Sequence, residues 1–499
     1  MEIQFQKSPL NYLQKVVHEV QNQEQTLEVR LSDGMPDIGR ILWCQGQVIL
    51  REKQWNSGSM EVSGGVQAWV LYAPEDGTDP RCVESWLPFR MSWDLGNEQR
   101  EGKIRVSPRL RSLDARSISA RKLMVRAGLG ILGEALVEDT AYLAKPEELP
   151  KDVELLRQMY PVMLDKVAGE KQFQMEEDLT LPGSVPVPEK LICYSVRPEI
   201  TEQRISGNRL IFRGNGNLHI LYRCDAGQLH SWDFSLPFSQ LAELPSVFED
   251  SAQGDISMAV TALELDLEEG GRMGLKCGLL GQYLVRDRQM LELVTDAYSP
   301  MRKAEPLMEE LELLVQLDNR QEPFRAEQTL PQEANLVVDV GFYPDFPRQQ
   351  RKDSGVELQM QGQFQTLFYN HEGVLQSAHS RWEGQLPVAM GENAWLQAEP
   401  RLISSPQGDP GHGSITLKAE AVMDLQSMAE ETFPMVMGMR LEPEGEKDPN
   451  RPSLILRRLG EDDLWSIAKR AGSTVYAIRR ANGMEGEPKK DQILLIPIP

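Results

Sequence analysis

Three stretches of the chain repeat one pattern of apolar and polar positions. In each stretch an apolar run that ends in tyrosine is followed by a tight turn containing glycine and then by a second run into Leu-Pro. The Leu-Pro leucines are 149 and 150 residues apart. Because solenoid units span only about 20–50 residues, this period predicts repeated domains. The apolar runs are residues 66–72, 218–222 and 364–369, the turn glycines are Gly77, Gly227 and Gly373, and the leucines are Leu87, Leu236 and Leu386.

Within each repeat, apolar residues alternate with polar ones in several short runs, which indicates strands with one buried face. The turns contain glycine, which accepts a positive φ angle, so neighbouring runs are predicted to pair as hairpins. The proline after each leucine cannot donate to a ladder and is expected at a strand start, an edge or a bulge. Many short strands without intervening helices predict a mainly β, multi-domain protein. Its three tandem β-sandwich-like repeats are expected at residues 25–140, 171–286 and 323–441.

The segments outside the repeats carry other patterns. Leu10, Leu13 and Val17 recur at helical spacing, which predicts an N-terminal helical segment over residues 1–24. The segments between the repeats are expected to be linkers with some helical character. The stretch before the last domain is rich in proline, glycine and charge, which favours a flexible linker. These three linkers are residues 141–170, 287–322 and 442–452.

The last segment, residues 453–499, is patterned differently from the repeats. An aspartate can cap a first helix that ends at Gly472, and Ser473 or Thr474 can cap a second helix that ends at Asn482-Gly483. One apolar run precedes the first helix and another follows the second. This order predicts a small α+β (βααβ) domain, in which two helices cover a two-stranded sheet.

The charge narrows the kinds of partner. At pH 7 the 499-residue chain carries a formal net charge of −22, which argues against nucleic acid because the phosphates would be repelled. Residues 452–499 carry eight Lys/Arg and six Asp/Glu, so this segment is slightly basic and the rest is strongly acidic. No apolar run approaches the roughly 18 residues of a membrane span, and the first residues do not resemble a signal peptide. We therefore expect a cytoplasmic protein without membrane insertion.

The sequence contains little that indicates catalysis or a cofactor. No two of its five cysteines form a C-x-x-C pair, and Cys44 and Cys193 share one repeat position where the third repeat has Tyr343, which favours packing over a disulfide or a metal site. Residues 128–133 match G-x-G-x-x-G but fall in a predicted strand, without the helix that a dinucleotide site requires. No Walker loop, H-E-x-x-H or G-x-S-x-G is present. We expect a protein that is not an enzyme and holds no metal or cofactor.

The last segment closely resembles a LysM module, through residues 464–468, 472–475 and 493–497 together with Ile478 and Asn482-Gly483. The three repeats, with their Leu-Tyr, glycine turn and Leu-Pro, resemble SPOCS domains. SPOCS repeats followed by one LysM module resemble the SipL family of spore-coat assembly proteins. The resemblance implies a non-catalytic protein of the mother cell, at the forespore surface. Its LysM module would dock on the coat-basement ATPase, stage IV sporulation protein A.

LysM modules usually bind N-acetylglucosamine glycans in a groove between the loop before the first helix and the loop after the second. Where the family has Gly-Asp-Thr, this chain has Gly460-Glu461-Asp462-Asp463, and three acids suit a basic protein surface better than an anionic wall polymer. Alternatively, the acids only favour the helix N-terminus, and Trp465 belongs to the core. Peptidoglycan binding at the spore cortex or cell wall is the alternative function. The candidate contact residues are Gly460, Glu461, Asp462, Asp463, Leu464, Trp465, Asn482, Gly483 and Met484.

Overall fold

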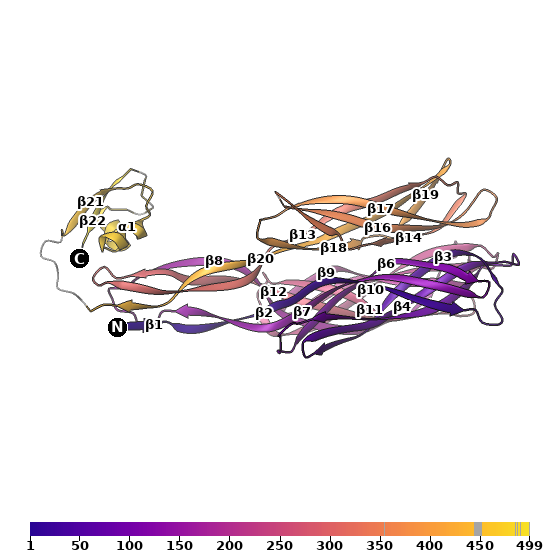
Figure 1. The fold of residues 1–499 in the computed structure, drawn as a ribbon, viewed down its shortest axis with the longest axis horizontal. Helices are drawn as coiled ribbons and strands as arrows, with labels where there is room; N and C mark the ends of the chain where they lie inside the picture. Colours follow the sequence, from indigo (N-terminus) through magenta and orange to yellow (C-terminus); the bar gives the residue numbers. More distant parts are fainter. Residues whose placement is uncertain (354, 444–451, 485, 487, 490, 499) are drawn as a thin grey trace.

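The protein is elongated and built almost entirely of antiparallel strands (Figure 1). The computed structural model describes residues 1–353, 355–443, 452–484, 486, 488–489 and 491–498. Strand accounts for 76% of the structure and helix for 3%, which confirms the prediction of a mainly β, multi-domain protein. Three β units lie together at one end, and a narrower stalk leads from them to the end that holds both termini.

The first β unit consists of two sheets that face each other. One has the order β2 (Gln6–Arg30), β7 (Lys122–Lys145), β6 (Gly102–Ser119), and the other has the order β3 (Ile38–Asn56), β4 (Ser59–Pro74), β5 (Arg81–Asp94). Alternate residues of these strands point between the sheets, where Val62, Trp93, Leu113 and Leu129 are fully buried. Removal of these apolar side chains from water is the main force that holds the two sheets together.

The second β unit has the sheet orders β11-β12-β8 and β10-β9. Its core includes Phe212, Leu263, Leu275 and Cys277. The long strand β9 takes the place of both β3 and β4, because it bends back without a break to pair with β10. The strands are β8 (Glu154–Thr180), β9 (Pro188–Cys224), β10 (Leu229–Phe248), β11 (Gln253–Leu267) and β12 (Arg272–Tyr298).

The third β unit again has two sheets, and its core includes Leu358, Phe364, Leu417 and Met423. In one sheet β16 pairs with β14, β15 and β17, and in the other β20 pairs with β13, β18, β19 and the short N-terminal strand β1 (Glu2–Gln4). The strands are β13 (Ala304–Leu330), β14 (Leu336–Pro344), β15 (Arg348–Lys352), β16 (Gly355–Tyr369), β17 (Leu375–Ala389), β18 (Ala394–Leu402), β19 (Gln407–Gly411) and β20 (Ser414–Leu441).

Three long ladders extend beyond the units and form the stalk: β2 with β7, β8 with β12, and β13 with β20. They pack around a shared core that includes Leu164, Leu293 and Val436. Where each ladder leaves its unit, its first strand carries one extra residue, and such a bulge bends and twists the strand. The extra residues are Val16, Lys166 and Leu317, at spacings of 150 and 151.

The helix predicted over residues 1–24 is wrong, because β1 and β2 occupy this segment. Leu10 packs in the stalk core, whereas Leu13 points to the other face of β2 and packs against Leu136 and Leu284 where the units meet. Both faces of β2 are covered by other strands here, so apolar and polar residues do not alternate along it. The spacing of the apolar residues therefore resembles that of a helix. Pairing with the distant strand β7 decides the structure instead.

The segments predicted as linkers are mostly strand. Residues 141–170 hold the end of β7 and the first part of β8, and residues 287–322 hold the end of β12 and the first part of β13. Pro161 does not interrupt β8, because this strand has a neighbour on one side only, an arrangement that tolerates proline. The predicted repeat boundaries therefore cut through continuous strands of the stalk.

The predicted turns and edges are confirmed. Gly77, Gly227 and Gly373 have φ angles of 73°, 81° and 74°, values that side chains with a Cβ rarely adopt. The three Leu-Pro pairs lie in β5, β10 and β17, each of which pairs with a neighbour on one side only. A proline there removes no hydrogen bond from the interior of a sheet.

The C-terminal module, residues 453–499, has the predicted order of strand, helix, helix, strand. Helices α1 (Leu464–Ala471) and α2 (Val475–Ala481) cover one face of the antiparallel pair β21 (Leu454–Arg458) and β22 (Ile493–Pro497). Their shared core includes Ile467, Ile478, Leu494 and Ile496. The linker predicted over residues 442–452 lies largely outside the described residues. Neither helix of the described structure is long and apolar enough to cross a membrane.

Candidate functional site

The first loop of the C-terminal module uses two of its acids to hold the module together. Asp463 is the N-cap of α1, and its Oδ1 accepts a hydrogen bond from Ser466 N at 2.8 Å. This bond lowers the pKa of Asp463. Asp462 lies between Arg457 Nη2 at 2.7 Å and Arg470 Nη2 at 2.6 Å, which ties β21 to α1. The loop is therefore not a row of free carboxylates, although Gly460, Glu461 and Asp463 are exposed.

Trp465 faces the chain's own stalk. Its Nε1 donates to Asp296 Oδ2 at 2.8 Å, and Lys469 Nζ lies 2.7 and 2.8 Å from the two oxygens of the same carboxylate. The Trp465 ring meets the Tyr298 ring edge-on at a centroid distance of 4.8 Å, and the Tyr298 hydroxyl donates to Ser473 O at 2.9 Å. Burial raises the pKa of Tyr298. The module is therefore docked on the end of β12 through its helical side.

The second loop also has a structural role. The Asn482 side chain accepts from Leu495 N at 2.8 Å and donates to Leu495 O at 2.7 Å and to Ile478 O at 2.8 Å. Gly483 has a φ angle of 58°, and Met484 packs against the module core. Asn482 thus occupies the outer edge of β22 and fixes it to the end of α2.

The structure brings the two predicted loops to one module core, which Leu464 and Met484 both contact. Most of the predicted residues cap, brace or fill the module, and Trp465 is neither fully buried nor free, because it binds the stalk. Whether the loops contact a partner stays a prediction. Sequence reasoning did not single out Asp296 or Tyr298 as contacts of this module, because no local pattern links them to a helix that begins more than 160 positions later.

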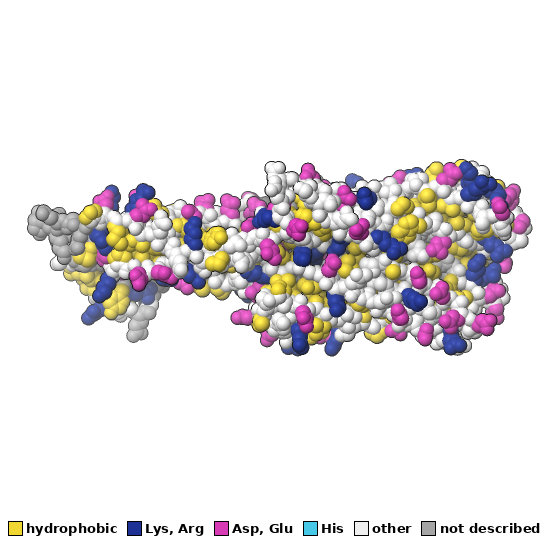
Figure 2. Space-filling model, turned by 90° about the horizontal axis from the view of Figure 1, so that it is seen from below, with side chains coloured by type: hydrophobic (Ala, Val, Ile, Leu, Met, Phe, Trp, Pro, Cys, Tyr) yellow, Lys and Arg dark blue, Asp and Glu magenta, His cyan; other side chains and the backbone are white. Residues whose placement is uncertain are grey.

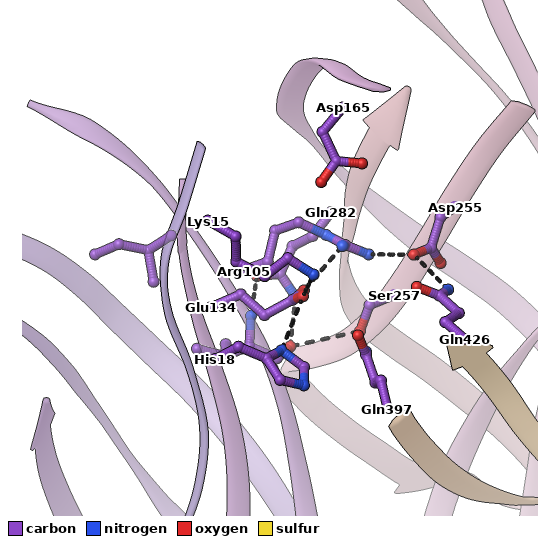
Figure 3. A network of polar contacts seen from close by, with 12 residues as sticks. Lys15, His18, Arg105, Glu134, Asp165, Asp255, Ser257, Gln282, Gln397 and Gln426 are labelled. Carbon is purple, nitrogen blue, oxygen red and sulfur yellow. Dashed lines mark hydrogen bonds and ion pairs between the residues drawn. The ribbon is translucent and has the colours of Figure 1, made fainter. Parts of the chain in front are cut away.

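A second cluster of polar side chains is buried where the three β units meet (Figure 3). Glu134 accepts from Lys15 Nζ at 2.6 Å and from Arg105 Nη1 at 2.9 Å. Arg105 also lies 3.4 Å from Asp255 of the second unit, which accepts from Gln426 of the third unit at 3.1 Å. Burial alone would raise the pKa of Glu134, but Lys15 and Arg105 hold it well below its usual range.

The network residues occupy one equivalent place in each unit. The pairs that stand opposite each other across the ladders are Arg105 with Glu134, Asp255 with Leu284, and Gln397 with Gln426. A cavity of about 500 Å³ borders them and is lined by arginines and carboxylates of the different units. Because the carboxylates of Glu134 and Asp255 are paired with cations, they stay ionised at neutral pH and cannot act as general acids. The network joins the units.

His219 forms another contact between units. Its Nδ1 lies 2.7 Å from Asp233 Oδ1 in the same unit, and its Nε2 lies 3.1 Å from Asp339 Oδ2 of the third unit. Burial disfavours the charged imidazole, but the two carboxylates outweigh it and raise the pKa of His219 to about 10. A histidine that stays protonated at neutral pH is an ion-pair partner and a poor general base.

Several features that resemble reactive sites in sequence pack the interior. β7 continues through residues 128–133, so no helix follows the glycines, and a Cβ on Gly133 would lie 2.7 Å from the Trp93 ring. All five cysteines are free, and burial raises the pKa of the Cys44 and Cys193 thiols. Within the described ranges, no group of three or more His, Cys, Asp or Glu is placed to hold a metal ion.

Comparison with known proteins finds a family match for one segment of the chain. A protein-family model described as SipL, SPOCS domain matches residues 188–268, the stretch that forms β9, β10 and β11. No curated protein and no solved structure matches the chain. The matched segment is the middle of the second β unit. It supports a SipL-like protein with a role connected to sporulation.

Proposed function

We propose that the protein is a non-catalytic adaptor in spore-coat assembly. Its three β units are SPOCS-type repeats that form a scaffold, and its C-terminal module is a LysM domain that docks on the coat-basement ATPase, stage IV sporulation protein A. This contact places the protein in the mother-cell cytoplasm at the forespore surface. Several moderate contacts on one chain raise the effective concentration of each, so together they hold the protein firmly in place.

The observation that carries the proposal is the SPOCS match at residues 188–268 in the second of three like-built units. The other two units have the same succession of paired strands, and the bulges at Val16, Lys166 and Leu317 recur with nearly the period of the Leu-Pro leucines. These regularities support three copies of one SPOCS-type domain.

The shape supports an adaptor. The bulk of the protein lies at one end, and the stalk carries the C-terminal module to the other (Figure 1). On the face seen in Figure 2, charged side chains of both signs are scattered without one large field of a single sign. Because the stalk separates them, the slightly basic module lies far from the acidic units. A partner therefore reaches the module without approaching the units.

The buried acids support the non-catalytic part of the proposal. Glu134 and Asp255 are paired with arginine or lysine, and this pairing outweighs burial and keeps both carboxylates ionised. An acid–base pair for catalysis requires groups whose proton affinities are separated and whose atoms face a substrate. The network at the junction has paired charges instead, which suits a structural role.

The alternative is binding of peptidoglycan glycan by the C-terminal module. The position where the LysM family has a threonine hydroxyl is Asp463, whose carboxylate caps α1, and Trp465 turns toward the stalk. These contacts occupy side chains that a sugar would need, so they favour a protein partner. Glu461 adds a negative charge to the same loop, which suits an anionic polymer poorly.

One experiment separates the two functions. The full chain and a chain that ends at residue 443 are each offered the purified ATPase and, separately, purified peptidoglycan. We expect the ATPase to capture the full chain but not the shortened one, and neither to sediment with peptidoglycan. Sedimentation of the full chain with glycan, without capture by the ATPase, would reverse the assignment.

A further inference from the structure

The two-stranded sheet of the C-terminal module is apolar on both faces, and only one face is covered. On the inner face Leu494 and Ile496 pack under the helices. On the outer face Leu454 is 51% exposed, Leu456 is 67% exposed and Ile493 is 65% exposed. These outer residues lie side by side across the two strands. The opposed pairs are Leu454 with Pro497, Leu456 with Leu495, and Arg458 with Ile493. A solvent-facing sheet surface normally carries polar side chains.

The two edges of this sheet also differ. The edge of β22 is occupied, because Asn482 bonds both the N–H and the C=O of Leu495. The backbone N–H and C=O groups that point toward the β22 side belong to every second residue of this segment. Ser453 O accepts from Ile498 N, Leu459 N donates to Gln492 O, and Leu459 O accepts from Asp491 N. The backbone N–H and C=O groups of the residues between them, Leu454, Leu456 and Arg458, therefore point away from β22, toward the open edge of the sheet. Among the described residues no strand pairs with this edge.

We propose that β21 is the docking strand of the module: an extended segment of a protein partner adds to its open edge and lays apolar side chains against Leu454 and Leu456. This inference rests on the proposed function and names the surface that performs it. An open edge beside an apolar face is the arrangement used in strand addition, where backbone bonds supply affinity and alternate side chains supply specificity.

Charge points to the kind of segment that binds. β21 ends in Arg457, which is paired with Asp462, and in Arg458, whose side chain lies 3.1 Å from Asp491 and is 70% exposed. The module is net positive while the rest of the chain is strongly acidic. A strand with alternating apolar residues and an acidic flank therefore complements β21. A second copy of this chain fits worse, because two chains of net charge −22 repel each other. A glycan also fits worse, because the outer face offers leucine, isoleucine and proline instead of hydrogen-bonding side chains.

The position of the module favours the same face. Its helical side is held against the stalk through Trp465 and Tyr298, so the outer sheet face points away from that contact. The docked module thus presents β21 to an approaching partner.

Two variants of the full chain test the inference, with the purified ATPase as the probe. Leu456→Lys places a charge on the apolar face, and Leu456→Pro removes an outward N–H without touching the inward ladder bonds. We expect each to weaken ATPase binding at least tenfold with an unchanged circular dichroism spectrum and melting temperature. The matched control is Tyr476→Lys on α2, at a residue 71% exposed, which should bind as the unaltered chain does.

The outcomes separate this site from the function. ATPase binding that is unchanged in Leu456→Lys, measured by biolayer interferometry, overturns the docking strand and leaves the adaptor function standing. Failure of the unaltered chain to bind the ATPase overturns both. A dimer of the unaltered chain in light scattering that Leu456→Pro converts to monomer overturns the inference in favour of a second copy. If Leu456→Pro unfolds, Leu456→Lys together with the Tyr476→Lys control still decides.

Discussion

Trp465 in the first turn of α1 donates its indole N–H to Asp296 near the end of β12, at 2.8 Å and across 169 positions of sequence. Lys469 binds the same carboxylate from the next turn of the helix, and the Tyr298 ring meets the indole ring edge-on. One aspartate therefore joins a small domain to a long stalk. The contact gives the module a defined orientation relative to the three β units.

We predict that Asp296→Ala loosens the module without unfolding the units. The substitution leaves the Trp465 N–H and the Lys469 ammonium without their acceptor, and loss of a hydrogen bond of this kind costs about 1–3 kcal/mol. Hydrogen exchange should rise in the last residues of β12 and in α1 but not in the unit cores. Glu309→Ala, at an exposed position of β13, is the control. Equal exchange in both variants would show that Asp296 does not hold the module.

We predict that the contact that His219 makes between the second and third units weakens at alkaline pH. Its pKa is raised to about 10 in the folded protein, against about 6.5 for an unperturbed histidine. The stabilisation is complete below the unfolded value and is lost as the pH rises through the folded value. We expect the wild type to lose roughly 1–3 kcal/mol more than His219→Gln between pH 7 and pH 10. Urea unfolding at several pH values measures this difference, and parallel curves would refute it.

The junction between the units predicts a difference between two similar substitutions. Glu134→Gln leaves Lys15 and Arg105 buried without their carboxylate, and removal of one partner from a buried pair costs about 3–5 kcal/mol. Gln426→Leu, at the equivalent place in the third unit, places an apolar side chain where the second unit has Leu284. It removes the amide hydrogen bonds to Asp255 and Arg286 but no charge, and we expect it to cost about 1–3 kcal/mol.

Unfolding in guanidinium, followed by circular dichroism, ranks the two variants. Equal destabilisation by Glu134→Gln and Gln426→Leu would mean that the charge of Glu134 contributes no stability beyond that of its hydrogen bonds. The pKa of Glu134 is held well below its usual range, so its contribution is present above about pH 4.5 and is lost as the pH falls further. Glu134→Gln should accordingly be less sensitive to acid than the wild type.

How much the sequence predicted depends on how local each interaction is. Gly77, Gly227 and Gly373 mark turns because a positive φ angle is a property of the residue itself, and Asp463 caps α1 through a residue three positions away. The strand β2 was not predicted because its partner β7 and the cover on its second face lie far along the chain. Local propensity is overruled where such tertiary contacts dominate.

The parts of the candidate site that sequence reasoning missed follow the same rule. Arg105, Asp255 and Gln397 occupy one structural position, yet they differ in charge and size, so no comparison of repeats draws attention to them. Their roles are visible only when the units are assembled and each buried charge has its partner. The contact of Asp296 with Trp465 is non-local in the same way.

The last prediction concerns what Asp463 contributes. Asp463→Ser keeps a side-chain oxygen for Ser466 N, whereas Asp463→Ala removes it, and loss of such a cap costs about 0.5–2 kcal/mol. Because the carboxylate is used within the module and the docking strand is β21, we expect Asp463→Ser to retain both stability and ATPase capture. Asp463→Ala should lower stability alone. Loss of capture in Asp463→Ser, with α1 intact by circular dichroism, would move the contact from β21 to the acidic first loop.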